Sequence, residues 1–507
     1  MRASQITDAT IFEETASIEP SKSWRNFLIG RPLQTADAPH QTIGKAVGLA
    51  VFASDALSST AYATQEIMFI LAAAGSGALG YVFPISIAIV TLMTIVTISY
   101  QQTIHAYPGG GGAYIVARDN LGELPAQTAG AALLTDYILT VAVSISSGVA
   151  QITSAFPQLF PYRVWISVAL VFFVMLINLR GVKESGLAFA APTYFFIITM
   201  FITVGLGFFR FFSGTLGTVV NPPEFHLEGA ILTVTPFLLL HAFSSGTAAM
   251  TGIEAISNGI TAFKEPRSKN AGITLIWMAS ILATLFLGIS FLASKVHTVP
   301  SEAETVISQL ARTVYGSQGI LYLAIIAGTA IILILAANTA FADFPRLSAL
   351  QANDGFLPRQ LTFRGSRLVF SRGIVTLAIA ASVLIIAFQA SVTRLIPLYA
   401  IGVFMSFTLS QAGMARRWWK SGRLQPEQEI IEPGSVLKRD NHWGLKMVIN
   451  GFGALCTFIV MITFAVTKFQ DGAWVILILI PLLVSIFMAI HFHYRSLAKK
   501  LSMDNYT

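Results

Sequence analysis

The chain has 507 residues, of which 54% are hydrophobic and only 11% are charged, and its mean hydropathy is +0.68. Soluble domains carry about 25% charged residues, so this composition excludes an ordinary soluble protein and predicts a polytopic membrane protein. The net charge of +7 does not indicate nucleic-acid binding, because the basic residues separate apolar runs instead of forming one patch. The single cysteine, Cys456, excludes an internal disulfide framework.

Twelve apolar runs, each long enough to cross a bilayer, follow a polar N-terminal segment. Residues 1–42 hold no apolar core of signal-peptide length, so we expect them to form a cytoplasmic tail. The twelve spans are predicted at residues 45–71, 83–105, 127–156, 163–179, 188–213, 232–261, 271–294, 317–345, 371–389, 393–415, 447–467 and 473–493.

The distribution of basic residues predicts the orientation of these spans. Cytoplasmic loops of membrane proteins carry an excess of Lys and Arg. If the N-terminus is cytoplasmic, 26 of the 32 basic residues lie inside and only six lie outside. These six are Arg163, Arg210, Lys295, Arg312, Arg394 and Lys468. We therefore expect a multi-pass protein of the cell membrane with both termini in the cytoplasm.

The first span contains polar residues that a membrane helix rarely tolerates. The stretch Val51–Glu66 places a carboxylate, three adjacent hydroxyls and a tyrosine in an otherwise apolar run. A central Asp costs about 2.5–3.5 kcal/mol in a membrane helix, so Asp55 is predicted to be functional rather than a packing residue. The hydroxyls of Ser58, Ser59 and Thr60 offer the backbone competing hydrogen bonds, which favours a helix that breaks near its middle.

The sixth span repeats this pattern. In Ala242–Asn258 a small, hydroxyl-rich interruption again precedes a carboxylate, here Glu254. Interrupted spans at corresponding places in two five-span units indicate an inverted-repeat transporter, although two unrelated small-residue packing faces are an alternative. The predicted organisation is a first repeat at 43–215, a second at 228–416, a cytoplasmic loop at 417–446, two further helices at 447–494 and a short cytoplasmic tail at 495–507.

Polar side chains recur at steps of three and four in three spans, so each set forms one helix face that cannot be exposed to lipid. Three such faces inside a bundle predict an oxygen-lined cavity. The sets are Asp55, Ser58, Ser59, Tyr62 and Glu66 in span 1; Asp136, Tyr137, Thr140, Ser144 and Ser147 in span 3; and Thr247, Thr251, Glu254 and Asn258 in span 6.

The chemistry of this set favours a cation as the ligand. It offers carboxylates, hydroxyls, phenols and freed backbone carbonyls, without a Lys or Arg in the core of these spans. An anion would instead require helix N-termini and cationic side chains. Spans 8 and 10 could complete the cavity, although helix–helix contact is an alternative of at least equal weight for the span-8 residues and for the Asn and Gln side chains. Their candidates are Asn338, Thr339 and Asp343, and Tyr399, Ser406 and Gln411.

A buried carboxylate can also carry a proton. Desolvation favours its neutral form and a neighbouring cation favours its ionised form, so the two ligands are coupled. Glu254 and Asp55 lie beside the predicted breaks and are the proton-coupling candidates, while Asp136 is a further candidate ion ligand. The residues alone do not assign the proton among these three.

Other motifs give no support to an enzyme or to a bound cofactor. The glycine-rich segment Tyr107–Tyr114 lacks the Gly-Lys-Ser/Thr ending of a phosphate loop, so it is interpreted as a flexible cytoplasmic loop. His105 and His241 are isolated and have no metal-binding spacing. The chain contains neither HExxH nor GxSxG, which argues against an intramembrane hydrolase.

Five stretches together carry a resemblance to a known family. They are Ser54–Tyr62, Ala106–Val116, Asp136–Ser144, Thr251–Asn258 and Ile396–Phe404. They resemble the KimA-type potassium–proton symporters of the amino acid–polyamine–organocation superfamily. The resemblance extends from about Phe27 through the last span. It implies an all-α, twelve-helix, LeuT-like five-plus-five inverted repeat with two additional helices, and potassium import coupled to protons.

The resemblance also implies a set of ion-pathway residues. Glu254 would couple protons, and the tyrosines would bind or gate the ion. Matched residue by residue, the potassium pathway falls on Asp55, Tyr62, Asp136, Tyr137, Thr140, Ser144, Thr251, Glu254 and Tyr399.

Two other functions remain as alternatives. An amino-acid or polyamine permease of the same superfamily is one, although Asp55 beside the break would repel an amino-acid carboxylate. A non-transporting membrane sensor is the other, but no attached signalling domain follows the last span. Some family members continue into a cytoplasmic C-terminal domain that supports dimerisation; this chain stops before it, so a homodimer of that kind is in doubt.

Overall fold

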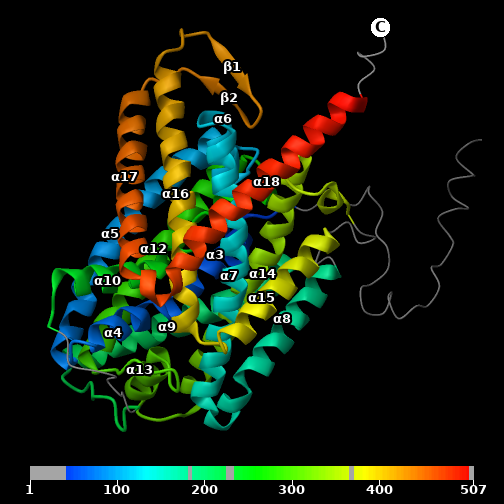
Figure 1. The fold of residues 1–507 in the computed structure, drawn as a ribbon. Coiled ribbons are helices and arrows are strands. Elements are labelled where there is room, and N and C mark those ends of the chain that lie inside the picture. Colours follow the sequence, from blue (N-terminus) through cyan, green and yellow to red (C-terminus); the bar gives the residue numbers. More distant parts are fainter. Residues whose placement is uncertain (1–41, 181–184, 224–232, 365–369, 502–507) are drawn as a thin grey trace, which may run out of the picture.

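The protein forms one bundle of membrane-spanning helices (Figure 1). The computed structural model describes residues 42–180, 185–223, 233–364 and 370–501. Within these ranges, nine helical segments are long and apolar enough to cross a membrane. A tenth crossing is the shorter apolar helix α15 (Ser371–Ala387), and two more are interrupted segments. The predicted all-helical, twelve-span architecture is therefore confirmed, whereas its division into two repeats stays a prediction.

The ten uninterrupted spans lie close to their predicted positions. Several run beyond the predicted ends, because the helices continue past the apolar run into polar residues. Spans 2 to 5 are α5 (Val82–Ala106), α7 (Glu123–Ala155), α8 (Arg163–Leu179) and α9 (Ser185–Phe212). Spans 7 to 10 are α12 (Arg267–Lys295), α14 (Ile320–Asn353), α15 and α16 (Val392–Gly422), and spans 11 and 12 are α17 (Trp443–Thr467) and α18 (Trp474–Leu501).

Spans 1 and 6 are both broken, as the sequence predicts. Span 1 consists of α3 (Lys45–Ser58), a 3₁₀ turn (Ser59–Ala61) and α4 (Ala63–Ala72). Span 6 consists of α10 (Pro236–Gly246), a 3₁₀ turn (Thr247–Met250), α11 (Ala255–Asn258) and a second 3₁₀ turn (Ile260–Ala262). Between Met250 and Ala255 the chain leaves helical geometry, since Thr251 is extended and Gly252 has a φ of +81°.

Hydroxyl groups replace part of the helical hydrogen bonding at the first break. Ser58 donates to the Asp55 carbonyl at 2.7 Å, and Thr60 donates to the Leu57 carbonyl at 2.7 Å. Such bonds to the preceding turn compete with the regular helical pattern and favour a bend or a tighter turn. The predicted mechanism of the break is therefore present in the structure.

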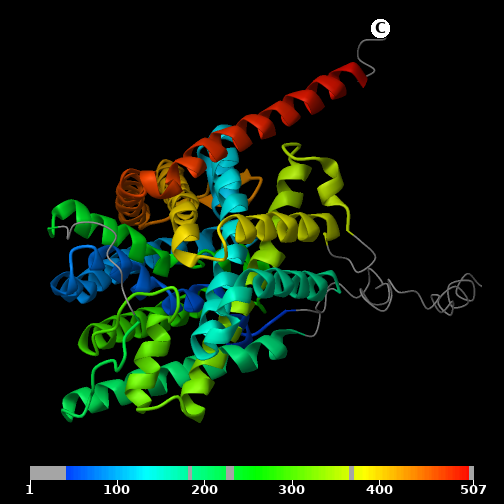
Figure 2. The same ribbon diagram turned by 60° about the horizontal axis from the view of Figure 1, so that its bottom comes forward.

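Span 3 forms the centre of the bundle. In the most apolar window of α7, 89% of the residues are buried inside the protein, compared with 17% for α8 and 28% for α17. Helices α14 and α16 pack along α7, and α17 packs along α16. In Figures 1 and 2, the C-terminal part of α18 extends away from the rest of the bundle. The polar stripe on α7 is thus held in the interior.

Several short elements were not predicted. Helix α6 (Gly112–Asn120) follows span 2, helix α13 (Val306–Tyr315) precedes span 8, and a hairpin of β1 (Glu429–Glu432) and β2 (Ser435–Lys438) follows span 10. The remaining elements are 3₁₀ turns at Ser76–Tyr81, Pro157–Tyr162 and Arg359–Thr362, and a π-helical turn at Phe469–Ala473. The hairpin and α13 lie at opposite ends of the bundle (Figure 1). We call these ends the hairpin face and the α13 face.

The glycine-rich segment after span 2 is only partly the loop that the sequence predicted. Its first half is a turn, and Gly110 and Gly111 have φ values of +79° and +98°. The helix α6 then begins at Gly112 and includes Tyr114, so the interpretation of the whole segment as a flexible loop is wrong. Glycine is required in the turn because L-residues with side chains rarely adopt this conformation.

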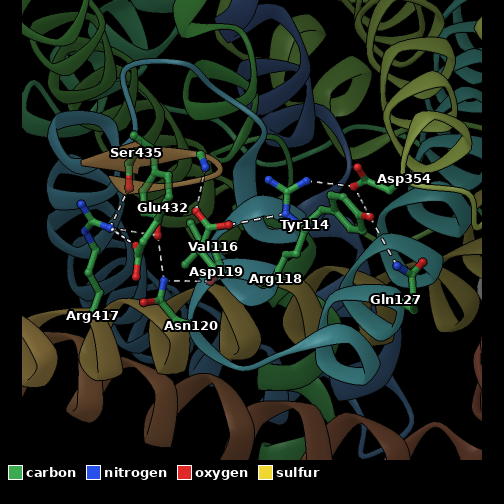
Figure 3. A network of polar contacts seen from close by, with 12 residues as sticks. Tyr114, Val116, Arg118, Asp119, Asn120, Gln127, Asp354, Arg417, Glu432 and Ser435 are labelled. Atoms are coloured by element: carbon green, nitrogen blue, oxygen red, sulfur yellow. Dashed lines mark hydrogen bonds and ion pairs between the residues drawn. The ribbon is translucent and has the colours of Figure 1, made fainter. Parts of the chain in front are cut away.

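A polar network fixes the hairpin to α6 and α16 (Figure 3). The buried Arg417 guanidinium donates to Glu432 at 2.8 Å, to Ser435 at 2.7 Å and to the Val436 carbonyl at 3.0 Å. From α6, Asp119 accepts a hydrogen bond from the Gly434 backbone N–H at 3.1 Å. The hairpin is thereby tied to the helix that follows the glycine turn.

Candidate functional site

The two broken spans face each other inside the bundle. The Ser59 hydroxyl in span 1 lies 3.0 Å from the Ala249 carbonyl in span 6. A Cβ atom at Gly252 would lie 2.7 Å from the backbone nitrogen of Ala56 and 2.9 Å from the carboxyl carbon of Asp55. Only a residue without a side chain fits there, so Gly252 brings the span-6 break directly against Asp55.

Three buried carboxylates gather around the breaks. Asp55, Asp136 and Glu254 are 8%, 2% and 4% exposed, and the charges of Asp55 and Glu254 act on Asp136. Oδ1 of Asp136 and Oε2 of Glu254 have no hydrogen-bond partner. Among the described residues, no Lys or Arg forms an ion pair with any of the three. The site therefore holds three titratable carboxylates without a protein counter-charge among the described residues.

The three carboxylates do not form a compact chelate. In the described part of the chain, no three His, Cys, Asp or Glu side chains converge on one point as a metal site requires. A cation bound here would need the neighbouring hydroxyl, phenol and carbonyl oxygens as well. That pattern suits a monovalent cation, which is bound through many oxygen dipoles.

Phenol and hydroxyl groups from α7, α16 and span 1 supply further oxygens. Thr140 donates to the Tyr399 hydroxyl at 3.1 Å, and the charges of Asp55, Tyr62 and Asp136 act on Tyr399. Tyr62 stands where the 3₁₀ turn of span 1 passes into α4 and is 5% exposed. These groups therefore lie beside the carboxylates, as the sequence predicts.

The remaining three predicted residues extend the site along its helices. Ser144 is 2% exposed and follows Thr140 by one turn of α7. Thr251, 1% exposed, donates to the Ala248 carbonyl at 3.0 Å inside the span-6 break. Tyr137 turns toward the hairpin side, where its hydroxyl accepts a hydrogen bond from Asn258 at 3.0 Å.

A cavity of about 230 Å³ connects this region with the hairpin face. Tyr137, Asn258 and Asp343 line its inner part, and the glycine turn and Arg346 line its outer part. Asp343 is 3.8 Å from Arg346, which is mostly exposed. Ile115, Leu133, Leu347 and Leu350 line the rest of the cavity, so it extends from the Tyr137–Asn258 pair toward that face between polar and apolar walls.

Sequence reasoning missed Tyr100 on α5. Its side chain is 1% exposed, its hydroxyl has no hydrogen-bond partner, and the charges of Glu254 and Asp136 act on it. A phenol near the end of an apolar span, directly before Gln101 and Gln102, was the available signal. From the sequence, the polar residues of span 8 could either pack between helices or belong to the site. Asn338 is a packing residue, since it accepts a hydrogen bond from Asn178 at 2.6 Å.

Comparison with known proteins identifies the family. The family described as "Amino acid permease" matches residues 44–487. The chain belongs to the amino acid permease family. It is 45% identical over 481 residues to "Potassium transporter KimA" of Bacillus subtilis (strain 168), a match that covers 94% of this chain and 76% of that protein. The family and the apolar helices identify a multi-pass membrane protein.

A solved structure gives a more distant match. The crystal structure of the Eremococcus coleocola manganese transporter, in complex with an aromatic bis-isothiourea substituted compound, is 13% identical. The match covers 93% of this chain and 94% of that chain, with a TM-score of 0.43. A likeness at this level has no bearing on the substrate.

Proposed function

We propose that the protein is a secondary transporter that imports potassium together with protons by alternating access. The observation that carries this proposal is the group of Asp55, Asp136 and Glu254, buried without a Lys or Arg partner among the described residues. A buried carboxylate without a counter-charge is costly, so it takes up a proton or binds a cation. The 45% sequence identity to "Potassium transporter KimA" supports potassium as that cation.

Repulsion among the three carboxylates supplies the coupling. A proton on Glu254 removes one of three like charges, which favours the ionised forms of Asp55 and Asp136 that bind potassium. Because the charges of these residues act on one another, occupancy by one ligand changes the affinity for the other. In this proposal Glu254 carries the proton and Asp55 binds the ion, with the oxygens of Tyr62, Thr140 and Tyr399 completing its shell.

The hairpin face is the cytoplasmic side in this proposal. The excess of basic residues in the loops on this side supports that orientation, with both termini inside. The cavity of about 230 Å³ then opens toward the cytoplasm and would be the release route. Tyr137 and Asn258, hydrogen-bonded at 3.0 Å, stand between the carboxylates and this cavity.

An amino-acid permease is the second candidate, since the family match carries that description. Amino-acid substrates present a carboxylate, and the Asp55 carboxylate at the break would repel it. Uptake of labelled amino acids and of a polyamine by the purified protein in liposomes separates the two. Saturable amino-acid or polyamine uptake without rubidium uptake would replace the potassium proposal.

Rubidium uptake by cells that lack their own potassium importers tests the proposal. We expect the protein to support growth at low potassium and rubidium uptake that increases as external pH falls. Asp55→Asn and Glu254→Gln should each abolish uptake, whereas Glu123→Gln, on an exposed carboxylate, should not. Absence of uptake despite normal expression would refute potassium transport. Normal uptake by both site variants would show that the carboxylates are structural.

A further inference from the structure

A second polar cavity lies near the α13 face, separate from the three carboxylates. It encloses about 30 Å³, enough for one or two waters or a desolvated cation. Its walls come from α4, α7, the start of α8, the segment before α13 and the start of α16, elements that meet at the end of the bundle opposite the hairpin (Figure 1). The lining is mainly oxygen-bearing: Gln65, Ser146, Thr153, Ser301, Glu302, Thr305, Ser391 and Thr393.

An unpaired buried hydroxyl faces this cavity. Ser146 is 1% exposed, lines the cavity, and its Oγ has no hydrogen-bond partner. Buried polar atoms without partners are uncommon in native structures, and a bound ion with this hydroxyl as a ligand would satisfy the atom. Glu302 supplies a carboxylate at the exposed rim, where it accepts a hydrogen bond from Ser391.

The same helices continue from this cavity to the deeper site. On α16, Thr393 lines the cavity and Tyr399 lies deeper; on α7, Ser146 follows Ser144. On α4, the buried Glu66 lies one turn after Tyr62 and accepts a hydrogen bond from Thr393 at 3.2 Å. Glu66 and Thr393 therefore form the floor between the cavity and the deeper oxygens.

We propose that this cavity is the outer access site of the transported cation, with Glu302 as its carboxylate ligand and Ser146 and Thr393 as hydroxyl ligands. The inference rests on the proposed cation transport. A cation would bind at Glu302 first and pass the Glu66–Thr393 floor when α4 separates from α16. The buried Lys468, whose charge acts on Glu66, provides that carboxylate with a counter-charge while the floor is closed.

Arg163 also lines the cavity and would favour an anion instead. Its Nε donates to the Gln389 carbonyl at 3.0 Å, and its Cζ lies 4.2 Å from the ring centre of Phe160, so part of the guanidinium is turned to these groups. The cation assignment rests on the Glu302 carboxylate and on the unpaired Ser146 hydroxyl. Chloride or phosphate inhibition of uptake, abolished by Arg163→Gln, would overturn the cation assignment.

The concentration dependence of rubidium uptake from outside tests the site. Loss of one ligand is worth about 1 kcal/mol, so Glu302→Gln and Ser146→Ala should each raise the half-saturating external rubidium concentration about fivefold, with little change in maximal rate. Glu302→Asp should restore most of the affinity. Glu304→Gln is the matched control: it removes the same charge two residues away, where the side chain binds Arg312 instead of the cavity.

Equilibrium rubidium binding to the purified protein separates this site from the deeper one. We expect Glu302→Gln to weaken one component of the binding, at the outer site, and to leave the other unchanged, because the three deeper carboxylates remain intact. Unchanged half-saturation in both Glu302→Gln and Ser146→Ala would overturn the outer site while leaving potassium transport standing. Absence of rubidium uptake by the unmodified protein would instead refute the proposed function itself.

Discussion

Replacement of Gly252 by alanine tests how closely the two breaks must approach. Its φ of +81° costs an L-residue with a side chain about 1–2 kcal/mol. The added Cβ would also lie 2.7 Å from the backbone nitrogen of Ala56 and 2.9 Å from the carboxyl carbon of Asp55. Such overpacking costs about 1–3 kcal/mol, so the whole change costs about 2–5 kcal/mol. If this free-energy cost destabilises the ion-binding conformation, the transport rate falls by about tenfold or more.

Rubidium uptake and thermal unfolding of the purified variants measure this effect. Gly214→Ala is the matched control, because Gly214 has a φ of +71° and an added Cβ would meet nothing within 4 Å. The control therefore carries the backbone strain without the contact with Asp55. We expect Gly252→Ala to lose transport and Gly214→Ala to keep it. Equal transport by the two variants would refute the close approach of the breaks as a requirement of the site.

Three further predictions concern the hydrogen bonds that hold the structure. Ser59→Ala removes the hydroxyl that lies 2.6 Å from the Ala56 carbonyl and 3.0 Å from the Ala249 carbonyl, and should lower the free energy of unfolding by about 1 kcal/mol in thermal melts. Arg417→Ala leaves a buried carboxylate with fewer partners and should destabilise the hairpin by about 3–5 kcal/mol, measured as faster proteolysis within residues 423–442. Although partial burial favours its neutral form, hydrogen bonds from Lys446 and a backbone N–H hold the pKa of Asp440 below its ordinary value. This stabilisation is present above the unfolded pKa of about 3.9 and is lost as pH falls through the lower folded pKa. Asp440→Asn should therefore reduce local amide-exchange protection at pH 7 and reduce it by less at pH 3, below the unfolded pKa.

Each of these three has a result that would contradict it. An unchanged melting temperature in Ser59→Ala would show that this hydroxyl adds nothing to stability. If the Arg417→Ala hairpin resisted protease as well as the unmodified one, the strand pairing alone would hold it. A constant difference between Asp440→Asn and the unmodified protein from pH 7 to pH 3 would exclude the ionised Asp440 as its cause.

The sequence predicted the spans and the breaks because both have local causes. Apolar runs of membrane length mark the helices, and the hydroxyls around Asp55 bond to their own preceding turn. The polar stripe of α7 required an interior position, which α7 occupies. Residues predicted from periodicity alone, such as Thr140 beside Tyr399, meet as expected once these helices pack.

The elements that escaped prediction depend on contacts between distant parts of the chain. Helix α6 and the hairpin are short and polar, and Asp119 joins them through Gly434, 315 residues away in the sequence. Tyr100 belongs to an apolar span, and its position beside the site becomes apparent only when α5 packs near Glu254. A periodic pattern within one segment does not predict these contacts between distant segments, because they arise from tertiary packing.

Simultaneous measurement of potassium and proton flux is the most direct test of the central claim. The full chain is reconstituted in liposomes with an inward potassium gradient, and both ions are followed as they enter. We expect protons to enter with potassium, and an imposed inward proton gradient to drive potassium uphill; Glu254→Gln should abolish both. Potassium entry at the same rate with and without a proton gradient, unaffected by Glu254→Gln, would contradict proton-coupled transport at this site.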